Sequence, residues 1–280
     1  MKIPIILFFS AFLAISPTES WAQEIVFKNR GKQVRVLTLG EIEKIVPATT
    51  VRVFEPHESA IREYKGFQSN SLFTAIYGQE WEKAEEILFT CSDGYQPSIP
   101  SERFKKYEGY LAYSRPGTKE FVLHNKLQNN ELVKLGPLYL VWDNIKSPEL
   151  RDDGGYGWPY QITAVDLINF SDRFPKMAPP GDSPSEVKNG FLSFRAYCMS
   201  CHTINGEGGG KSVELNYPVN VTEYIQEPWL LKWIDNPASM RYNTTMPALN
   251  PNLKDREKII KNIVAYLKTM KDNKGKPASE

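Results

Sequence analysis

The 280-residue sequence predicts two domains of different fold class, an α+β domain at the N-terminus and an all-α domain at the C-terminus. Residues 23–170 mix strand-like alternation with short helical patterns, whereas residues 186–272 show helical periodicity alone. Between them, residues 171–185 contain four prolines, and we expect them to form a semi-rigid linker that contributes to no core. The polar residues 273–280 are expected to form a flexible tail.

Residues 1–22 have the pattern of a cleavable signal peptide. Lys2 provides the positive charge at the start, an apolar run follows, and a small-x-small cleavage site ends at Ala22. The apolar run is too short to span a bilayer, and no later stretch approaches that length. We therefore expect an exported, periplasmic protein with no membrane span after cleavage.

The composition is that of a soluble globular protein, with 41% hydrophobic and 24% charged residues. The formal net charge is +1, and the sequence contains no basic stripe. This charge distribution argues against nucleic acid as a partner.

The N-terminal domain is predicted from period-two alternation for strands and from capped apolar spacing for helices. Thr38 and Glu41 form a capping box before one short helix, and Gly78 ends a second helix that begins near Ser69. Gly66 interrupts the pattern between the two, and we expect a break there. The predicted strands cover residues 33–39, 49–54, 86–90, 109–113, 138–142 and 160–167.

The first helix of the C-terminal domain is expected to start at residues 183–186, which read Ser-Pro-Ser-Glu. This is a capping box with proline at the first helical position. Four apolar residues then recur at spacings of four, three and four, so they share one face of the helix. They are Val187, Phe191, Phe194 and Cys198.

Two further helices complete the predicted C-terminal domain. Pro228 opens the middle helix and Pro237 ends it, while Asn252 and Asp255 are expected to cap the last helix. The inward-facing residues are expected to be Trp229, Leu230, Trp233 and Ile234 in the middle helix, and Leu253, Ile260, Ile263, Val264, Leu267 and Met270 in the last.

Residues 198–202 read Cys-Met-Ser-Cys-His, which is the C-x-x-C-H signature of covalent haem attachment. One turn of chain brings Cys198 and Cys201 to the same side, where their thiols can add to the two vinyl groups of a haem. His202 follows at once and is placed to be the proximal iron ligand. The pattern therefore predicts one covalent haem c.

The alternatives for this motif are a disulfide, a zinc half-site and a thioredoxin-like redox site. A thioredoxin-like site needs a βαβ setting, and the residues before the motif are helical. A structural zinc site needs about four protein ligands. The other cysteine and histidines of the chain are all distant in sequence: Cys91, His57 and His124.

Residues 186–271 resemble class I cytochromes c. In that family a small residue precedes an aromatic residue by four positions and C-x-x-C-H follows, as Gly190, Phe194 and Cys198 do here. The family's last helix crosses the first with an aromatic residue at the contact, which Tyr266 matches. The resemblance implies electron transfer, with Gly190 and Tyr266 as packing residues.

The resemblance also implies a distal methionine between the middle and last helices. Met246, in the sequence Thr-Thr-Met-Pro, fits that loop. Met240 is the alternative, but it closely follows Pro237 and is followed by arginine. Histidine and methionine together fill both axial positions of the iron, which leaves no place for substrate and favours electron transfer.

Two loop features beside the expected haem complete the comparison with class I cytochromes. In many relatives a proline carbonyl accepts a hydrogen bond from the proximal imidazole, and Pro218 is the candidate here. Glycines at positions 206, 208, 209 and 210 are expected to form a flexible loop. That loop is not a phosphate site, because no strand precedes it and no helix follows it.

The N-terminal domain resembles, through short motifs, the molybdopterin-binding domain of the sulfite-oxidase type. In that family a cysteine just after the first core strand ligates molybdenum, but residues 54–59 contain no cysteine here. Molybdopterin is therefore not expected, Cys91 is expected to be a lone buried thiol, and His57 is expected to be exposed. The motifs are residues 51–54, 64–67, 93–95, 111–113 and 136–142.

Two functions remain open from the sequence. The first is an exported monohaem electron carrier whose N-terminal domain docks it to a redox protein partner. The second is an oxidoreductase whose N-terminal domain binds a molybdopterin or small substrate and passes electrons to the haem. The missing molybdenum cysteine favours the first, and a haem sensor is a weaker third reading because it would need an open axial position.

Overall fold

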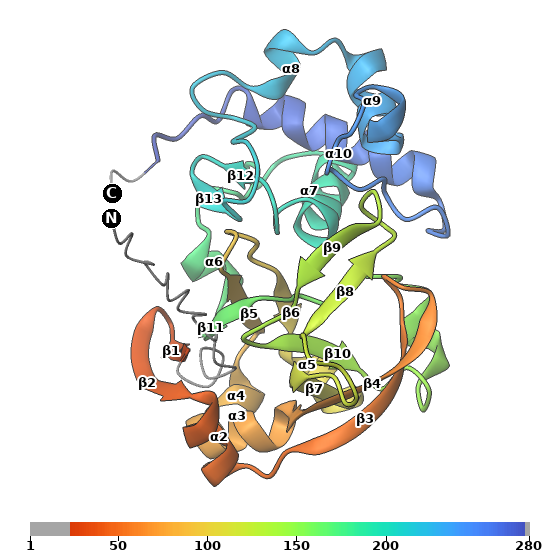
Figure 1. The fold of residues 1–280 in the computed structure, drawn as a ribbon. Coiled ribbons are helices and arrows are strands. Elements are labelled where there is room, and N and C mark those ends of the chain that lie inside the picture. The colour runs from red at the N-terminus through yellow and green to blue at the C-terminus, as the bar shows by residue number, and fades with distance from the viewer. Residues whose placement is uncertain (1–22, 278–280) are drawn as a thin grey trace, which may run out of the picture.

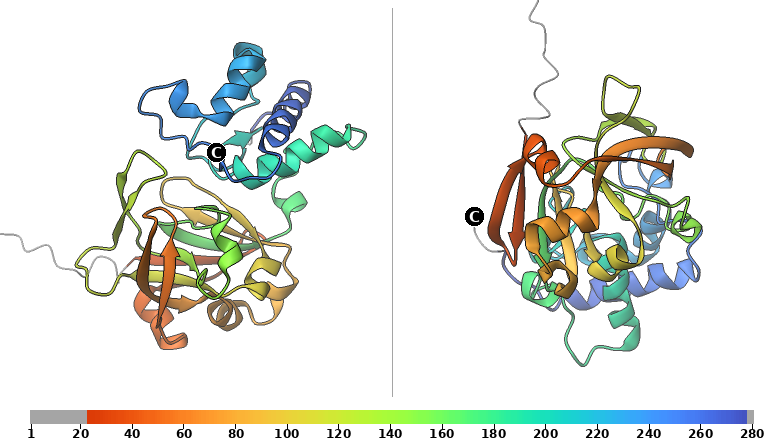
Figure 2. Two further views of the ribbon diagram at one scale, coloured as in Figure 1. Left: turned by 90° about the vertical axis from the view of Figure 1, so that its right-hand side faces the viewer. Right: turned by 90° about the horizontal axis from the view of Figure 1, so that it is seen from below.

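The computed structural model describes residues 23–277, so the predicted signal peptide lies outside the described residues. Two main sheets and their helices form the N-terminal domain, and a group of helices forms the C-terminal region (Figure 1). Each has a core of buried apolar side chains. The left view of Figure 2 also shows the C-terminal helices on one side of the sheets. No helix among residues 23–277 is long and apolar enough to cross a membrane.

The first sheet has five strands, in the spatial order β2 (Lys32–Thr38), β1 (Glu24–Asn29), β11 (Ile162–Ile168), β5 (Glu86–Cys91) and β6 (Ser98–Pro100). β1 pairs with β11 in parallel, and the other pairs are antiparallel. Leu88 on β5 and Ile168 on β11 belong to the core of the C-terminal region, while Ile87 and Leu167 belong to the N-terminal core. These two strands are therefore covered on both faces, which explains their nearly continuous apolar sequence.

The second sheet is antiparallel, in the order β10 (Tyr139–Trp142), β7 (Gly109–Ser114), β4 (Ala60–Gln68) and β3 (Thr49–Glu55). The predicted break at Gly66 is wrong, because Gly66 lies inside β4. A Cβ atom at Gly66 would lie 2.5 Å from Cα of Ala112 on β7. Glycine is needed here for close approach of two strands, at a point where their register shifts.

The remaining elements of the N-terminal domain are short. The predicted capping box of Thr38 and Glu41 is confirmed at the start of α2, and Gly78, with φ of 63°, follows the end of α3 as predicted. A separate hairpin, β8 (Val122–Asn125) and β9 (Glu131–Lys134), extends toward the C-terminal region (Figure 1). The helices are α2 (Leu39–Ile45), α3 (Ser69–Tyr77), α4 (Glu80–Lys83), α5 (Ser101–Lys106) and the 3₁₀ turn η1 (Pro148–Arg151).

The proline-rich segment packs against the C-terminal region. Its first residues belong to the short helix α6 (Phe170–Arg173), and the side chains of Phe174 and Met177 are buried in the core of that region. The Tyr266 hydroxyl donates a hydrogen bond to the Met177 carbonyl at 2.7 Å. The prediction that residues 171–185 contribute to no core is therefore wrong: the segment runs through turns, and Phe174 and Met177 face inward.

The C-terminal region is built around two crossing helices, α7 (Ser185–Tyr197) and α10 (Arg256–Met270). Gly190 is buried at the crossing, and the ring of Tyr266 packs against Phe191 and Phe194 with centroid distances of 5.5 and 5.3 Å. The smaller elements are α8 (Val221–Tyr224), α9 (Glu227–Asp235), the 3₁₀ turn η2 (Pro237–Ser239) and the two-residue strands β12 (Thr203–Ile204) and β13 (Glu207–Gly208).

Three local predictions for these helices are wrong. Pro184 occupies the N-cap of α7 and Asp255 that of α10, and neither helix has a side-chain cap hydrogen bond. Asp255 adopts a left-handed conformation, with φ of 55°, instead of the extended one in which a capping side chain reaches the first turn. Trp229 was expected to face inward but is 51% exposed, while Leu230 and Ile234 carry the buried side of α9.

Candidate functional site

Residues 198–202, here called the attachment motif, form a tight turn at the end of α7. The Cys198 N–H continues the helix to the Phe194 carbonyl at 2.8 Å, and the N–H groups of Cys201 and His202 both bond the Cys198 carbonyl. Both thiols are free and only partly exposed. Burial raises the pKa of Cys198 to about 12 and that of Cys201 to about 11. Burial therefore favours the neutral thiol form of both side chains.

The His202 imidazole is oriented by the backbone of the segment that follows the motif. Its Nδ1 lies 2.9 Å from the Val213 carbonyl oxygen. Because a carbonyl can only accept, Nδ1 carries the proton and Nε2 keeps a lone pair for a metal. Burial also lowers the pKa of His202, which favours the neutral ring. The prediction that the Pro218 carbonyl is the acceptor is wrong, because the Val213 carbonyl takes that position. Every residue has a backbone carbonyl, so the sequence gives no signal for Val213.

The glycines after the motif allow close backbone contact. A Cβ atom at Gly209 would overlap the Ser200 carbonyl oxygen, and one at Gly208 would lie 2.5 Å from the His202 carbonyl oxygen. Gly208 also ends the small β12–β13 hairpin. We expected these glycines to make the loop flexible. They instead allow the backbone of residues 208–209 to lie directly against the motif.

Residues 240–255, here called the methionine loop, connect η2 to α10 and contain both predicted distal ligands. Met240 and Met246 are each partly exposed, so burial does not distinguish between them. The Met246 N–H donates to the Thr244 hydroxyl at 3.2 Å, which fixes a local turn just before Met246.

The N-terminal domain contacts the attachment motif through the loop between β5 and β6. The Gln96 N–H donates to the Ser200 carbonyl at 2.8 Å, inside the motif itself. Nearby, the Gly210 N–H donates to the Gly94 carbonyl at 2.9 Å, and Lys211 pairs with Asp93 at 2.6 Å. The motif is thus held from the N-terminal domain as well as from α7.

Cys91 lies at the end of β5, beside this contact. It is 3% exposed and unpaired, so the predicted lone buried thiol is confirmed. Its N–H donates to the Tyr95 carbonyl at 2.9 Å, which closes the turn. Burial raises the pKa of the Cys91 thiol well above its usual value, which favours the neutral thiol.

A buried polar cluster in the N-terminal domain was not predicted as a group. His57 is 6% exposed, so the expectation that it is exposed is wrong. Its Nδ1 lies 2.8 Å from Glu55, and the hydroxyls of Tyr64 and Tyr139 donate to the same carboxylate at 2.7 and 2.9 Å. Burial, reinforced by the nearby carboxylate, raises the pKa of both tyrosines.

The strand pattern does contain a signal for this cluster. The side chains of Val51 and Val53 on β3 face the core of the N-terminal domain, and Glu55 continues the same period-two pattern with 0% exposure. A carboxylate on the inward face of a strand must find hydrogen-bond donors. The predicted strand ended at Phe54, one residue before that signal.

Aromatic and basic side chains connect this cluster to the attachment motif. The Tyr160 ring lies 6.2 Å from the His57 ring and 6.3 Å from the Tyr139 ring. Lys211 Nζ lies 5.7 Å from the ring centres of both Tyr160 and Tyr95. Tyr95 lies in the β5–β6 loop, which contacts the motif. Neighbouring side chains therefore connect the buried polar cluster to the attachment motif.

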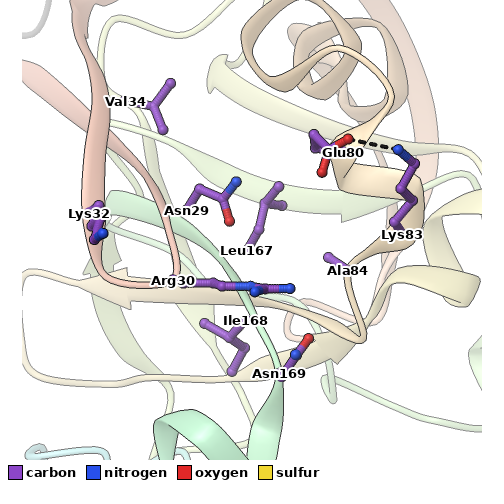
Figure 3. A pocket seen from close by; sticks show the side chains of 10 residues that line it. All are labelled: Asn29, Arg30, Lys32, Val34, Glu80, Lys83, Ala84, Leu167, Ile168 and Asn169. Carbon is purple, nitrogen blue, oxygen red and sulfur yellow. Dashed lines mark hydrogen bonds and ion pairs between the residues drawn. The ribbon is translucent and has the colours of Figure 1, made fainter.

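The two described cavities lie elsewhere. One, of about 500 Å³, opens between β1, the β1–β2 turn and α4, and is lined by Arg30, Lys32 and the ion pair of Glu80 with Lys83 (Figure 3). The other, of about 770 Å³, lies beside α3 and includes Trp81 in its lining. Neither cavity is lined by a residue of the attachment motif, the methionine loop or the buried polar cluster.

Comparison with known proteins gives one assignment. Residues 187–271 match the cytochrome c family, whereas no curated protein matches the chain and the N-terminal domain remains without a family. The geometry fits the group that this family implies, since two neutral thiols and an imidazole with a free Nε2 lie within one turn. Residues 187–271 therefore form a cytochrome c domain, which implies covalent haem c and haem-based electron transfer.

Proposed function

We propose that the protein is an exported electron-transfer protein that carries one haem c. In this proposal Cys198 and Cys201 hold the haem through thioether bonds, and His202 and Met246 are the axial ligands of its iron. The bound haem supplies a one-electron couple. The observation that carries the proposal is the orientation of His202, whose Nδ1–H is bonded to Val213 within a C-x-x-C-H turn.

The protein residues around the motif prepare it for this role. The Val213 carbonyl fixes the tautomer and the plane of the His202 ring, so Nε2 is presented without a competing proton. The hydrogen bonds of Cys198 to Phe194 and of His202 to Cys198 hold the two thiols and the imidazole on one turn. Little reorganisation is then needed when the site is filled.

Met246 is proposed as the distal ligand on its sequence context. A thioether favours ferrous over ferric iron, so histidine with methionine gives a higher potential than two histidines would. Two protein ligands also leave no coordination position for a substrate. This is the ligation expected of a carrier that exchanges electrons with a redox protein.

The N-terminal domain is proposed to be a docking and structural module. It touches the attachment motif through Gln96, and it lacks a cysteine at residues 54–59. Cys91 is the only cysteine of the sequence outside the attachment motif. Its thiol is buried and unpaired, which supports a structural role. Molybdopterin is therefore left out of the proposal.

Export and a periplasmic location rest on the sequence of residues 1–22 and on the haem. In bacteria, attachment of haem to C-x-x-C-H takes place outside the cytoplasmic membrane. The proposed partner is accordingly a redox protein on that side of the membrane, and nucleic acid has no part in the function.

One observation favours a second candidate function, an oxidoreductase that passes electrons from an N-terminal site to the haem. Glu55 and His57 are a buried ionisable pair that the carrier does not need, and Tyr160 connects them to the region of the motif. Beside Tyr139, the buried indole N–H of Trp158 has no acceptor among the described residues. A buried pair with an unused donor is typical of a ligand site.

Protein purified from the periplasm distinguishes the two functions. The carrier requires the mass of one haem on the mature chain, a low-spin visible spectrum, and neither stoichiometric molybdenum nor a second organic cofactor. Absence of covalent haem would overturn both functions. Molybdenum or a pterin at one equivalent would promote the oxidoreductase above the carrier.

A further inference from the structure

The hairpin β8–β9 of the N-terminal domain reaches the methionine loop and bonds it at two adjacent carbonyls. The side-chain amide of Gln128 donates to the Thr245 carbonyl, and that of Asn129 donates to the Thr244 carbonyl, both at 2.9 Å. These are the two residues directly before Met246. Figure 1 shows the hairpin rising from the sheets toward the C-terminal helices.

The methionine loop has few other constraints of its own. Within the described part of the chain, residues 242–249 make no backbone-to-backbone hydrogen bond. The loop is fixed by side chains instead: Thr244 accepts from Met246, and the Arg256 guanidinium donates to the Leu249 carbonyl. Segments held in this way open easily, so each hydrogen bond from the N-terminal domain contributes substantially to keeping the loop closed.

A third bond from the N-terminal domain holds the far end of the loop. The Asn250 side chain donates to the Asp152 carbonyl at 2.9 Å. Gln128 and Asn129 therefore act on one side of Met246, and Asp152 acts on the other. The N-terminal domain spans the segment that contains the methionine.

The hairpin is itself held firmly enough to position another segment. Leu123 and Val133 anchor its strands in the N-terminal core. At its tip, Asn125 donates to the Gln128 side-chain oxygen at 2.9 Å, which leaves the Gln128 amide N–H₂ directed at the loop. Asn129 adopts a left-handed conformation with φ of 51°, which asparagine tolerates well.

We propose that Gln128 and Asn129 are positioning residues that keep Met246 on the iron, so that the N-terminal domain controls the distal ligation of a haem held by another domain. The proposal rests on the proposed function, because it takes Met246 as the distal ligand. It extends that function by giving the N-terminal domain a role in setting the redox potential. It also predicts that separating the two domains weakens the distal bond.

The test uses the full-length haem protein with Gln128→Glu and Asn129→Gly combined. Gln128→Glu keeps the oxygen that accepts from Asn125 and removes the donor to Thr245, and glycine accepts the left-handed backbone at position 129. The matched control is Asn130→Gly, because Asn130 has the same left-handed conformation, with φ of 55°, and its side chain bonds none of the described residues. Met246→Ala is measured beside them.

Imidazole added to the ferric protein binds where Met246 leaves, so its apparent affinity reports opening of the loop. With the loss of two neutral hydrogen bonds, we expect the double variant to bind imidazole about tenfold more tightly or better, and to show a weaker thioether-to-iron absorption band and a lower midpoint potential. Asn130→Gly should match the unmodified protein in all three.

Two outcomes overturn the proposal, and they are distinguishable. If Met246→Ala abolishes the thioether band while the double variant keeps both the wild-type band and the wild-type imidazole affinity, the ligand is right and the positioning role is wrong. If Met246→Ala leaves the band intact, the distal ligand itself is wrong, and the positioning role falls with it.

Discussion

Gly190 in α7 packs directly against the backbone of Asn262 in α10. A Cβ atom at position 190 would overlap the Asn262 carbonyl oxygen and would lie 2.9 Å from Cβ of Tyr266. The two helices of the cytochrome c domain can therefore cross at this distance only with glycine at position 190. Because α7 leads into the attachment motif and α10 follows the methionine loop, the crossing fixes the elements that carry both proposed iron ligands.

Gly190→Ala is expected to destabilise the haem protein by about 2–3 kcal/mol, because the added methyl group must push α7 away from α10. Chemical denaturation followed by helical circular dichroism measures this loss. Gly181→Ala is the matched control, since no atom lies within 4 Å of the Cβ position at Gly181. Equal unfolding free energies for the two variants would contradict the packing argument.

The cysteines of the motif should each be needed for haem attachment. Cys198→Ser and Cys201→Ser each remove one thiol, so each variant can form at most one thioether bond. We expect exported protein with defective haem attachment, and a C-terminal region that is less stable because its core loses a large apolar group. Intact mass and haem staining of denatured protein measure this. Cys91→Ser, on β5, should keep full attachment.

A helical C-terminal region of full stability without attached haem would contradict the second part of this prediction. A wild-type amount of covalently attached haem in either variant would contradict the first.

The parts of the fold that the sequence predicted are those with local signals. The capping box of Thr38 with Glu41, the helix end at Gly78 and the alternation in β3 are each written within a few adjacent residues. Strand β4 was not predicted because Gly66 is needed for close contact with Ala112 on the neighbouring strand β7, and Ala112 is distant in sequence. Such a close approach depends on tertiary structure and cannot be recognised from neighbouring residues.

The candidate site divides in the same way. Cys198, Cys201 and His202 are recognisable because haem attachment needs three residue types at fixed spacing. The Val213 carbonyl could not be predicted, since a backbone acceptor carries no residue identity. The contact of Gln128 with the methionine loop joins two domains, and a surface glutamine gives no sign of its partner.

Glu58 should make the N-terminal domain sensitive to acid. Burial raises the pKa of its carboxyl group, but the hydrogen bond from Arg62, the N–H of His124 and the charge of Arg115 outweigh burial and hold the pKa below its usual value. A lowered folded-state pKa contributes stability above the unfolded-state value, about 4.3 for glutamate, and that stability is lost as pH falls through the folded-state pKa.

Glu58→Gln should therefore reduce the loss of unfolding free energy between neutral pH and acid, with little change in the slope above neutrality. Urea denaturation at a series of pH values measures this. Glu63→Gln, at an exposed position in strand β4, is the control for the loss of one carboxylate. An unchanged pH dependence in Glu58→Gln would show that other carboxylates dominate acid unfolding.

His57→Ala decides between the two candidate functions of the N-terminal domain. The substitution removes the side-chain partner of a fully buried carboxylate, Glu55, and leaves the backbone N–H of residue 57 and the hydroxyls of Tyr64 and Tyr139 as its donors. We expect a loss of about 1.5–3 kcal/mol in unfolding free energy, the range for hydrogen bonds to charged groups. His124→Ala, at an exposed position on β8, should cost much less.

For an electron carrier, the folded His57→Ala protein should keep the wild-type midpoint potential and the wild-type rate of haem reduction by a periplasmic extract. For an oxidoreductase, the same folded protein should lose haem reduction by that extract while reduction by dithionite stays intact. The cluster is structural if only stability changes. If haem reduction is lost at a temperature where the variant is fully folded, Glu55 and His57 belong to a site that feeds electrons to the haem, and the carrier proposal fails.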